Sequence, residues 1–205
     1  MKTTTLIVPG YRGSGPQHWQ SWLESRIEDS HRVTGIDWDS PELLKWAEVL
    51  SAEIAKTTGK VWIVAHSFGC LASAVAIQDW KHKIAGVLFV APATPRRFTL
   101  AGPIQEGVPG NEINISASIP YQNLDTFGVL VASRDDPWMP FEEAQSWANS
   151  WGLATYDAGF SGHINEASGH GAWPDGEELL NAIFFATGNK KESEFTLPFL
   201  KSRVS

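Results

Sequence analysis

Short apolar runs recur along the chain, and the stretches between them space their apolar residues three and four positions apart. The runs at 61–65 and 84–90 are continuously apolar, which is typical of strands covered on both faces of a parallel sheet. The pattern predicts six strands, over residues 4–8, 33–37, 61–65, 84–90, 126–132 and 153–157.

The intervening stretches predict helices. Ser40 is expected to cap one of them, with Pro41 at its first position and Gly59 at its end. Strands that alternate with helices predict an α/β fold, with a mostly parallel six-stranded sheet and helices on both faces. Residues 91–125 are proline-rich and aperiodic, so we expect an irregular excursion, too short for a lid domain. The helices are predicted over 17–29, 41–58, 68–79, 140–151 and 175–186.

Length and composition indicate one globular domain. The 205 residues are 42% hydrophobic and 19% charged, and no linker divides them, so we expect a single domain over 1–187. Residues 188–205 form a tail, either docked or mobile. The net charge of -7 gives no basic surface for nucleic acid or an anionic membrane. The one cysteine, Cys70, excludes an internal disulfide, and without a signal or membrane segment we expect a cytoplasmic protein.

A candidate nucleophile lies where a buried strand turns directly into a helix. The segment Ala65-His66-Ser67-Phe68-Gly69 places small residues two positions before and after a serine, as the nucleophile elbow of an α/β-hydrolase requires. Ala65 departs mildly from the usual glycine. The alternative is a serine that only caps the following helix. The strand before it and the alanine-rich helix after it favour the nucleophile, Ser67.

A serine nucleophile needs an acid and a base, which in α/β-hydrolases follow it in the order acid, then histidine. Asp135 and Asp136 both follow the predicted strand 126–132, and either could orient the base. Asp136 is favoured because it begins an Asp-Pro-x-x-Pro run, although both acids could instead cap the next helix. Of the histidines after the last strand, His163 is favoured over His170 because it lies nearer to that strand.

The remaining parts of the site are predicted from position. The backbone N–H groups of Tyr11 and Phe68 are expected to form the oxyanion hole. His66, Trp138 and Trp173 are candidate pocket residues, with the rings of Tyr11 and Phe68 nearby.

The glycines of the loop at 10–16 imitate a dinucleotide-binding motif, but their spacing is wrong for one. The Tyr-x-x-x-Lys pair of a short-chain dehydrogenase is also absent from the sequence. Neither metal-ligand spacing nor a cofactor motif is recognisable, so we expect no cofactor.

These segments together resemble a known family. The segments are Val8-Pro9-Gly10 with Gly13-Ser14-Gly15-Pro16 and His18-Trp19, the elbow, Asp135-Asp136-Pro137-x-x-Pro140, and Gly162-His163-Ile164-Asn165 with Ser168-Gly169 and Trp173-Pro174. They resemble the retinoblastoma-binding-protein / YdeN family of small serine hydrolases, from about Leu6 to the last helix. The resemblance implies a compact α/β-hydrolase fold with Ser67 as nucleophile, Asp136 as acid and His163 as base.

We therefore expect an esterase-like serine hydrolase acting on an ester, thioester or activated amide of a small molecule. Two alternatives remain: a binding protein that keeps the fold with little catalysis, and an acyltransferase that uses the same residues. Animal members of the family bind a partner protein, but no motif in this sequence supports a protein partner. The family does not define a substrate.

Overall fold

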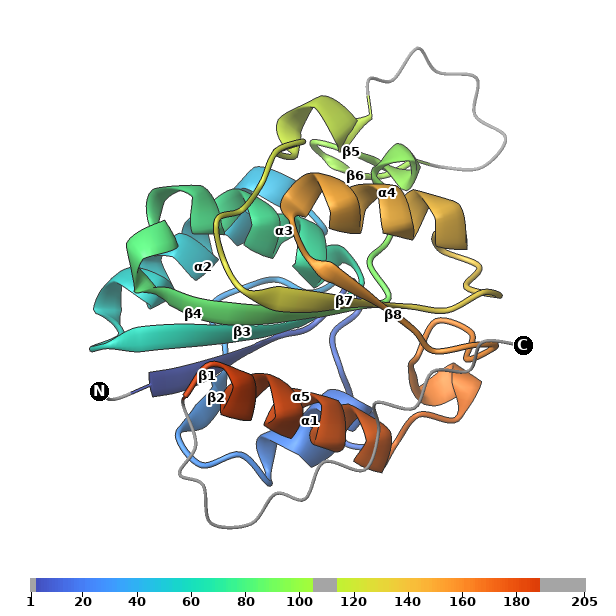
Figure 1. Cartoon of the computed structure of the whole chain (residues 1–205). Helices are drawn as coiled ribbons and strands as arrows, with labels where there is room; N and C mark the ends of the chain where they lie inside the picture. Colours follow the sequence, from blue (N-terminus) through green and yellow to red (C-terminus); the bar gives the residue numbers. More distant parts are fainter. Residues whose placement is uncertain (1–2, 105–113, 189–205) are drawn as a thin grey trace.

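The structure is a computed structural model that describes residues 3–104 and 114–188. Its centre is a six-stranded sheet in which every pair of neighbouring strands is parallel, in the order β2-β1-β3-β4-β7-β8 (Figure 1). This sheet confirms the predicted fold class. The strands are β1 (Thr3–Val8), β2 (Ser30–Arg32), β3 (Lys60–His66), β4 (Ile84–Val90), β7 (Gly128–Ala132) and β8 (Ala154–Asp157).

Helices cover both faces of the sheet (Figure 1). One face carries α2 (Leu43–Lys56), α3 (Phe68–Ala76) and α4 (Phe141–Trp151). The other face carries α1 (Trp19–Glu24) and α5 (Pro174–Ala186). Among the described residues, no helix is long and apolar enough to cross a membrane.

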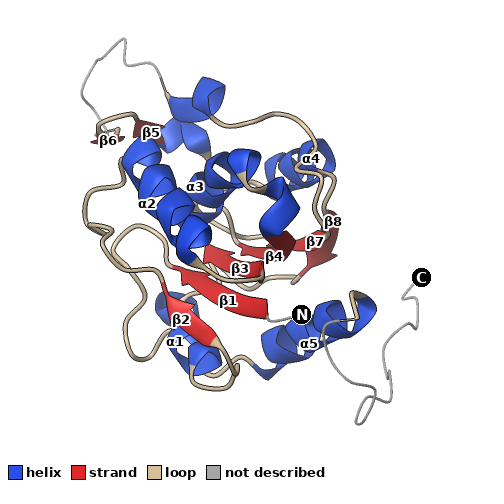
Figure 2. Cartoon of the chain, turned by 90° about the vertical axis from the view of Figure 1, so that its left-hand side faces the viewer, coloured by secondary structure: helices blue, strands red, loops and turns tan. Residues whose placement is uncertain are grey.

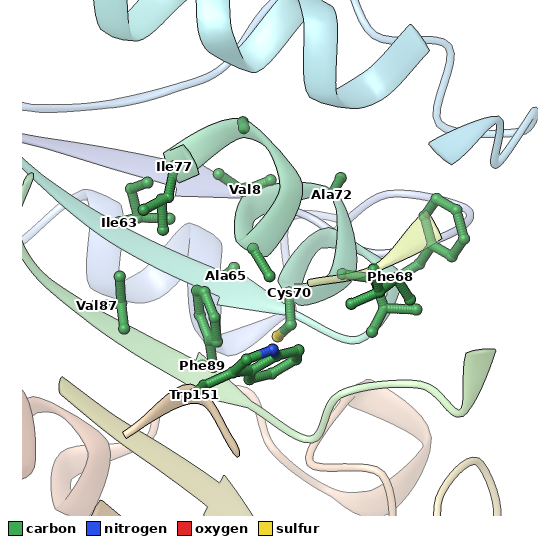
Figure 3. Packing of buried hydrophobic residues seen from close by; sticks show 14 of the residues in the cluster. Val8, Ile63, Ala65, Phe68, Cys70, Ala72, Ile77, Val87, Phe89 and Trp151 are labelled. Carbon is green, nitrogen blue, oxygen red and sulfur yellow. The ribbon is translucent and has the colours of Figure 1, made fainter. Parts of the chain in front are cut away.

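The larger apolar core lies between the sheet and the α2, α3 and α4 layer (Figure 3). Phe89 of β4 meets Trp151 of α4 edge-on, with ring centroids 5.6 Å apart. Phe68 and Cys70 of α3 are fully buried in the same core. Each large apolar side chain buried in this way contributes roughly 1.5–3 kcal/mol, so this core fixes α3 against β3.

The predicted second strand is wrong. The strand that pairs with β1 is Ser30–Arg32, at the sheet edge beside α1 (Figure 2), and not 33–37. Val33 still donates its N–H to the carbonyl of Ile7, but Gly35 has a φ of +84°, and the chain leaves the sheet there. An edge strand can be short and polar, so an apolar pattern could not locate it.

Two helices begin two residues later than predicted, and the first of them also ends earlier, at Glu24 and not at residue 29. Helix α1 begins at Trp19 because the side chain of His18 accepts the backbone N–H of Gln20 and caps it. Helix α2 begins at Leu43, with Glu42 at the N-cap position and no side-chain cap. Ser40 does not cap this helix, since its hydroxyl bonds the carboxylate of Glu42 instead, at 3.2 Å.

The excursion between β4 and β7 is largely irregular, as predicted. Its described part holds the short antiparallel pair β5 (Phe98–Thr99) and β6 (Gly102–Pro103). Single turns of 3-10 helix, η3 (Pro95–Arg97) and η4 (Ile115–Ser118), flank that pair. Residues 105–113 lie outside the described residues, and so does the predicted tail from 189 onward.

Candidate active site

Ser67 lies in a strained turn between β3 and α3. Its φ of +54° and ψ of -125° fall outside the regions that a serine ordinarily adopts. The turn is crowded: a Cβ added at Gly69 would collide with the carbonyl oxygen of Pro9, and one added at Gly10 would lie 2.6 Å from the Cβ of Ser67. Glycine is therefore needed at both positions so that two loops can meet around the serine.

A histidine and a carboxylate complete a chain of hydrogen bonds to Ser67. The Nε2 of His163 lies 2.8 Å from the Oγ of Ser67, and its Nδ1 lies 2.9 and 3.0 Å from the two oxygens of Asp136. All three side chains are buried: Ser67 and His163 are 5% and 7% exposed, and the Asp136 side chain is 3% exposed. The carboxylate accepts from Nδ1–H, so Nε2 is free to accept a proton from the serine.

The topology brings these three residues together. Ser67, Asp136 and His163 follow β3, β7 and β8, and the carboxyl ends of parallel strands meet at one edge of the sheet. The backbone N–H of Trp138 donates to Oδ1 of Asp136 at 2.8 Å and fixes the carboxylate toward His163. The order of strands in the sheet thus assembles residues that lie far apart in the chain.

Asp135, the other candidate acid, makes no hydrogen bond with His163 among those that the structure describes. Its Oδ1 accepts hydrogen bonds from the Ser133 hydroxyl at 2.7 Å and from the Gly162 N–H at 2.8 Å. These two bonds, that from Ser133 first, hold the pKa of Asp135 below its usual range. Asp135 therefore ties the loop after β7, here called the acid loop, to the loop that carries His163.

The two predicted oxyanion-hole residues, Tyr11 and Phe68, belong to the two segments that meet around Ser67. Phe68 is the first residue of α3, and Tyr11 follows Gly10, whose Cα packs against Ser67. Within the part of the chain that the structure describes, neither N–H donates to an acceptor. The positive end of α3 adds a favourable field for negative charge at this place.

An open cavity of about 520 Å³ lies over Ser67. His66 and Trp138, two of the predicted pocket residues, line it together with Tyr11. Trp173 does not: its ring packs edge-on against Trp19, with centroids 5.1 Å apart, in the apolar cluster on the other face of the sheet. The Phe68 ring is likewise buried in the core, so only its backbone faces the site. Within residues 3–104 and 114–188, no group of three or more His, Cys, Asp or Glu side chains is placed to hold a metal ion.

The comparison with protein families agrees with this geometry. The model of the family described as serine hydrolase matches residues 5–182. The chain belongs to the serine hydrolase family.

Known relatives of this serine hydrolase cover nearly the whole chain. YdeN of Bacillus subtilis strain 168 is 25% identical over 197 residues, which are 90% of this chain and 97% of YdeN. A solved YdeN-like protein from Pectobacterium atrosepticum is 33% identical, with a TM-score of 0.79 over 91% of this chain and 92% of that one. Est1E of Butyrivibrio proteoclasticus shares the fold at 14% identity, with a TM-score of 0.66 over 92% of this chain and 89% of its own.

Sequence reasoning missed several residues that line the hydrolase pocket, among them Arg12, Glu166 and the buried His18. His18 precedes the serine in the chain, so the expected order of acid and base gives it no role. It is nevertheless 4% exposed and lines the cavity, and its ring meets that of His66 with centroids 4.9 Å apart. The sequence signal that could have pointed to His18 is the His18-Trp19 pair, which is one of the segments that carry the family resemblance. His170, the alternative base, bonds the Ser168 hydroxyl at 3.2 Å and contacts neither Ser67 nor Asp136 among the described hydrogen bonds.

Two of the pocket histidines are neutral at pH 7. Burial, aided by the charge of Arg32, lowers the pKa of His18 to about 4. The Gln20 N–H donates to Nδ1 of His18, so its proton is on Nε2. Burial, followed by the nearby His163 and His18, likewise holds the pKa of His66 well below its usual range. These rings act near pH 7 as uncharged hydrogen-bonding groups.

The buried histidines predict a loss of stability in acid. The unfolded pKa of His18, about 6.5, exceeds its folded value, so the unfolded chain binds more protons as the pH falls below 6.5. His18 alone should lower the free energy of unfolding by about 2 kcal/mol between pH 7 and pH 5. Urea unfolding at the two pH values measures this. His18→Asn keeps the helix cap and should remove about that share, whereas an unchanged pH dependence would contradict the assignment.

Proposed function

We propose that this serine hydrolase cleaves esters, thioesters or activated amides of small molecules through an acyl-enzyme formed on Ser67. The observation that carries the proposal is the unbroken hydrogen-bonded chain from Asp136 through His163 to Ser67. A serine hydroxyl is a weak nucleophile, and this arrangement is what activates it. The strained elbow supports the same role, since it places Ser67 in the lining of the cavity.

In the first half-reaction, the Oγ of Ser67 attacks the carbonyl carbon while its proton moves to Nε2 of His163. Asp136 stabilises the resulting imidazolium and holds its orientation. The N–H groups of Tyr11 and Phe68 donate to the oxyanion of the tetrahedral intermediate. The intermediate collapses when the bond to the leaving group breaks and Nε2 delivers the proton to that group. The acyl group is then an ester of Ser67.

In the second half-reaction, water attacks the acyl carbon and gives a proton to His163. The second tetrahedral intermediate collapses by breaking the bond to Oγ of Ser67, which recovers the proton from Nε2. The products are a carboxylic acid and the original enzyme. An acceptor other than water would give acyl transfer by the same steps.

The cavity supports a small substrate. Its volume of about 520 Å³ lies within the range of small-molecule sites. The rings of Tyr11 and Trp138 offer apolar surface for an acyl or aromatic group, while Arg12 and Glu166 bring opposite charges to the same lining. A short aliphatic or aromatic ester suits this mixture of surfaces.

A fluorophosphonate probe tests the proposal without knowledge of the natural substrate, because it phosphonylates an activated serine. We expect wild-type protein to be labelled on Ser67, and both Ser67→Ala and His163→Ala to lose the label. Ser146→Ala is the matched control, since Ser146 is exposed on α4 and bonds only the Tyr121 hydroxyl among the described contacts. Peptide mapping of the labelled protein identifies the modified residue.

The outcomes separate the candidate functions. An unlabelled but folded wild type would overturn the proposal in favour of a binding protein that retains the fold. If the label forms, incubation of a labile ester with competing alcohols or amines, followed by product analysis, separates hydrolysis from acyl transfer. Free acid as the main product in the presence of these acceptors supports hydrolysis.

A further inference from the structure

The loop that carries His163 has a strained backbone. Gly162 has a φ of +56°, and Ile164, on the other side of His163, has a φ of +46°. A positive φ is rare for a β-branched residue because its Cβ crowds the backbone. Ile164 is also fully buried, so its side chain has no freedom to relieve the crowding. Such a conformation persists only where surrounding contacts hold it.

Two ring N–H groups from outside the loop bond its consecutive carbonyls. Nε2 of His66 lies 2.9 Å from the carbonyl oxygen of His163, and Nε1 of Trp19 donates to the carbonyl oxygen of Ile164 at 2.8 Å. A carbonyl only accepts, so His66 carries its proton on Nε2. Both donors are buried, at 4% and 0% exposed, and their rings meet edge-on with centroids 6.0 Å apart.

These bonds act on the part of the backbone that sets the direction of the His163 side chain. The two carbonyls belong to the peptide planes that follow the Cα of His163 and the Cα of Ile164. Asp135 fixes the N–H of Gly162 on the preceding side. The backbone on both sides of His163 is therefore held by partners from other elements: β3, α1 and the acid loop. His66 is also the residue directly before Ser67, so one of these partners moves with the nucleophile.

We propose that Trp19 and His66 are positioning residues for His163. Their ring N–H groups hold the strained loop so that Nε2 of His163 stays against the Ser67 hydroxyl. The proposal rests on the proposed role of His163 as the base. Neither ring is required to touch the substrate for this role. A displacement of a catalytic group by about 1 Å can cost about 100-fold in rate, so loss of either donor should act on the chemical step.

Trp19→Phe and His66→Phe remove the donors and keep an aromatic ring. We expect kcat for 4-nitrophenyl acetate to fall about 10- to 100-fold in each. KM should change less than about twofold in Trp19→Phe, because Trp19 is not among the described residues that line the cavity. Trp62→Phe is the matched control for Trp19→Phe. Trp62 is equally buried in the same apolar cluster, but its Nε1 has no hydrogen-bond partner among the described residues. Trp62→Phe loses the same atoms as Trp19→Phe, and the kcat of Trp62→Phe should stay within about threefold of wild type.

A rescue variant and a proton resonance separate positioning from stability. His66→Gln keeps an N–H donor at the position of Nε2 and should recover most of the activity that His66→Phe loses. The Nδ1 proton of His163, bonded to Asp136, should give a far-downfield NMR signal in wild type and Trp62→Phe. That signal should broaden or disappear in Trp19→Phe and His66→Phe at a temperature where circular dichroism shows all variants folded.

The proposal is overturned if Trp19→Phe and His66→Phe match Trp62→Phe in kcat and keep the downfield signal. It is also overturned if folded His66→Gln is as slow as His66→Phe. The resonance needs no turnover, so it reports on the position of His163 even if the protein hydrolyses nothing. Absence of Ser67-dependent labelling in wild type would refute the proposed function, whereas normal wild-type labelling with unaffected variants would refute only the positioning role.

Discussion

Replacing Ser67 by alanine should lower kcat for 4-nitrophenyl acetate by about 10⁴- to 10⁶-fold. The loss is large because no other hydroxyl is bonded to His163 among the described residues, so no second serine can form the acyl-enzyme. His163→Ala should cost a similar factor, since the serine then has no group to accept its proton. Initial rates with purified variants, corrected for spontaneous hydrolysis, measure both losses.

The double variant is the sharper measurement. Residues that act as one unit have strongly non-additive effects, so Ser67→Ala/His163→Ala should be about as slow as either single variant. Any residual rate above that in buffer would come from substrate binding and from the N–H groups of Tyr11 and Phe68. Losses that multiply in the double variant would show that the two residues act independently, which contradicts the proposed mechanism.

The central part of the fold could be predicted because burial determines it locally. The strands β3 and β4 are covered on both faces, so their apolar runs appear directly in the sequence. The edge strand β2 could not be found in this way. Ser30–Arg32 is polar and partly exposed, and its place depends on its pairing with β1 and on the polar contacts of Arg32 with Glu24.

Some residues of the candidate site could likewise be predicted from the sequence, and others could not. Ser67 has a local signature, and the order of the loops at the strand ends directs attention to Asp136 and His163. The bonds from Trp19 to the loop carrying His163, and from His66 to the same loop, span 145 and 97 residues of chain. Contacts between residues so far apart in the chain produce no recognisable spacing pattern in the sequence. They become visible only when α1, β3 and the loop that carries His163 are placed in three dimensions.

The second large effect on kcat is expected from Asp136, the proposed acid beside His163 and Ser67. Asp136→Asn should lower kcat by about 10⁴-fold, although the side chain keeps its size. The amide oxygen can still accept the Trp138 N–H, which lies 2.8 Å from Oδ1. The amide NH₂ then replaces Oδ2, 3.0 Å from Nδ1 of His163. Nδ1 of His163 would then lie between the amide oxygen, at 2.9 Å, and the amide NH₂. An imidazole that accepts from this NH₂ carries its proton on Nε2 and cannot accept one from Ser67.

Asp135→Asn is the matched comparison, because the two acids are adjacent and the sequence allows either to serve. The amide oxygen of the replacement can still accept from the Ser133 hydroxyl and the Gly162 N–H, both of which now bond Oδ1 of Asp135. We therefore expect at most about a tenfold loss in kcat. If Asp135→Asn were the slower variant, the acid assignment would be wrong. Equal small losses in both variants would mean that His163 needs no carboxylate to act as the base.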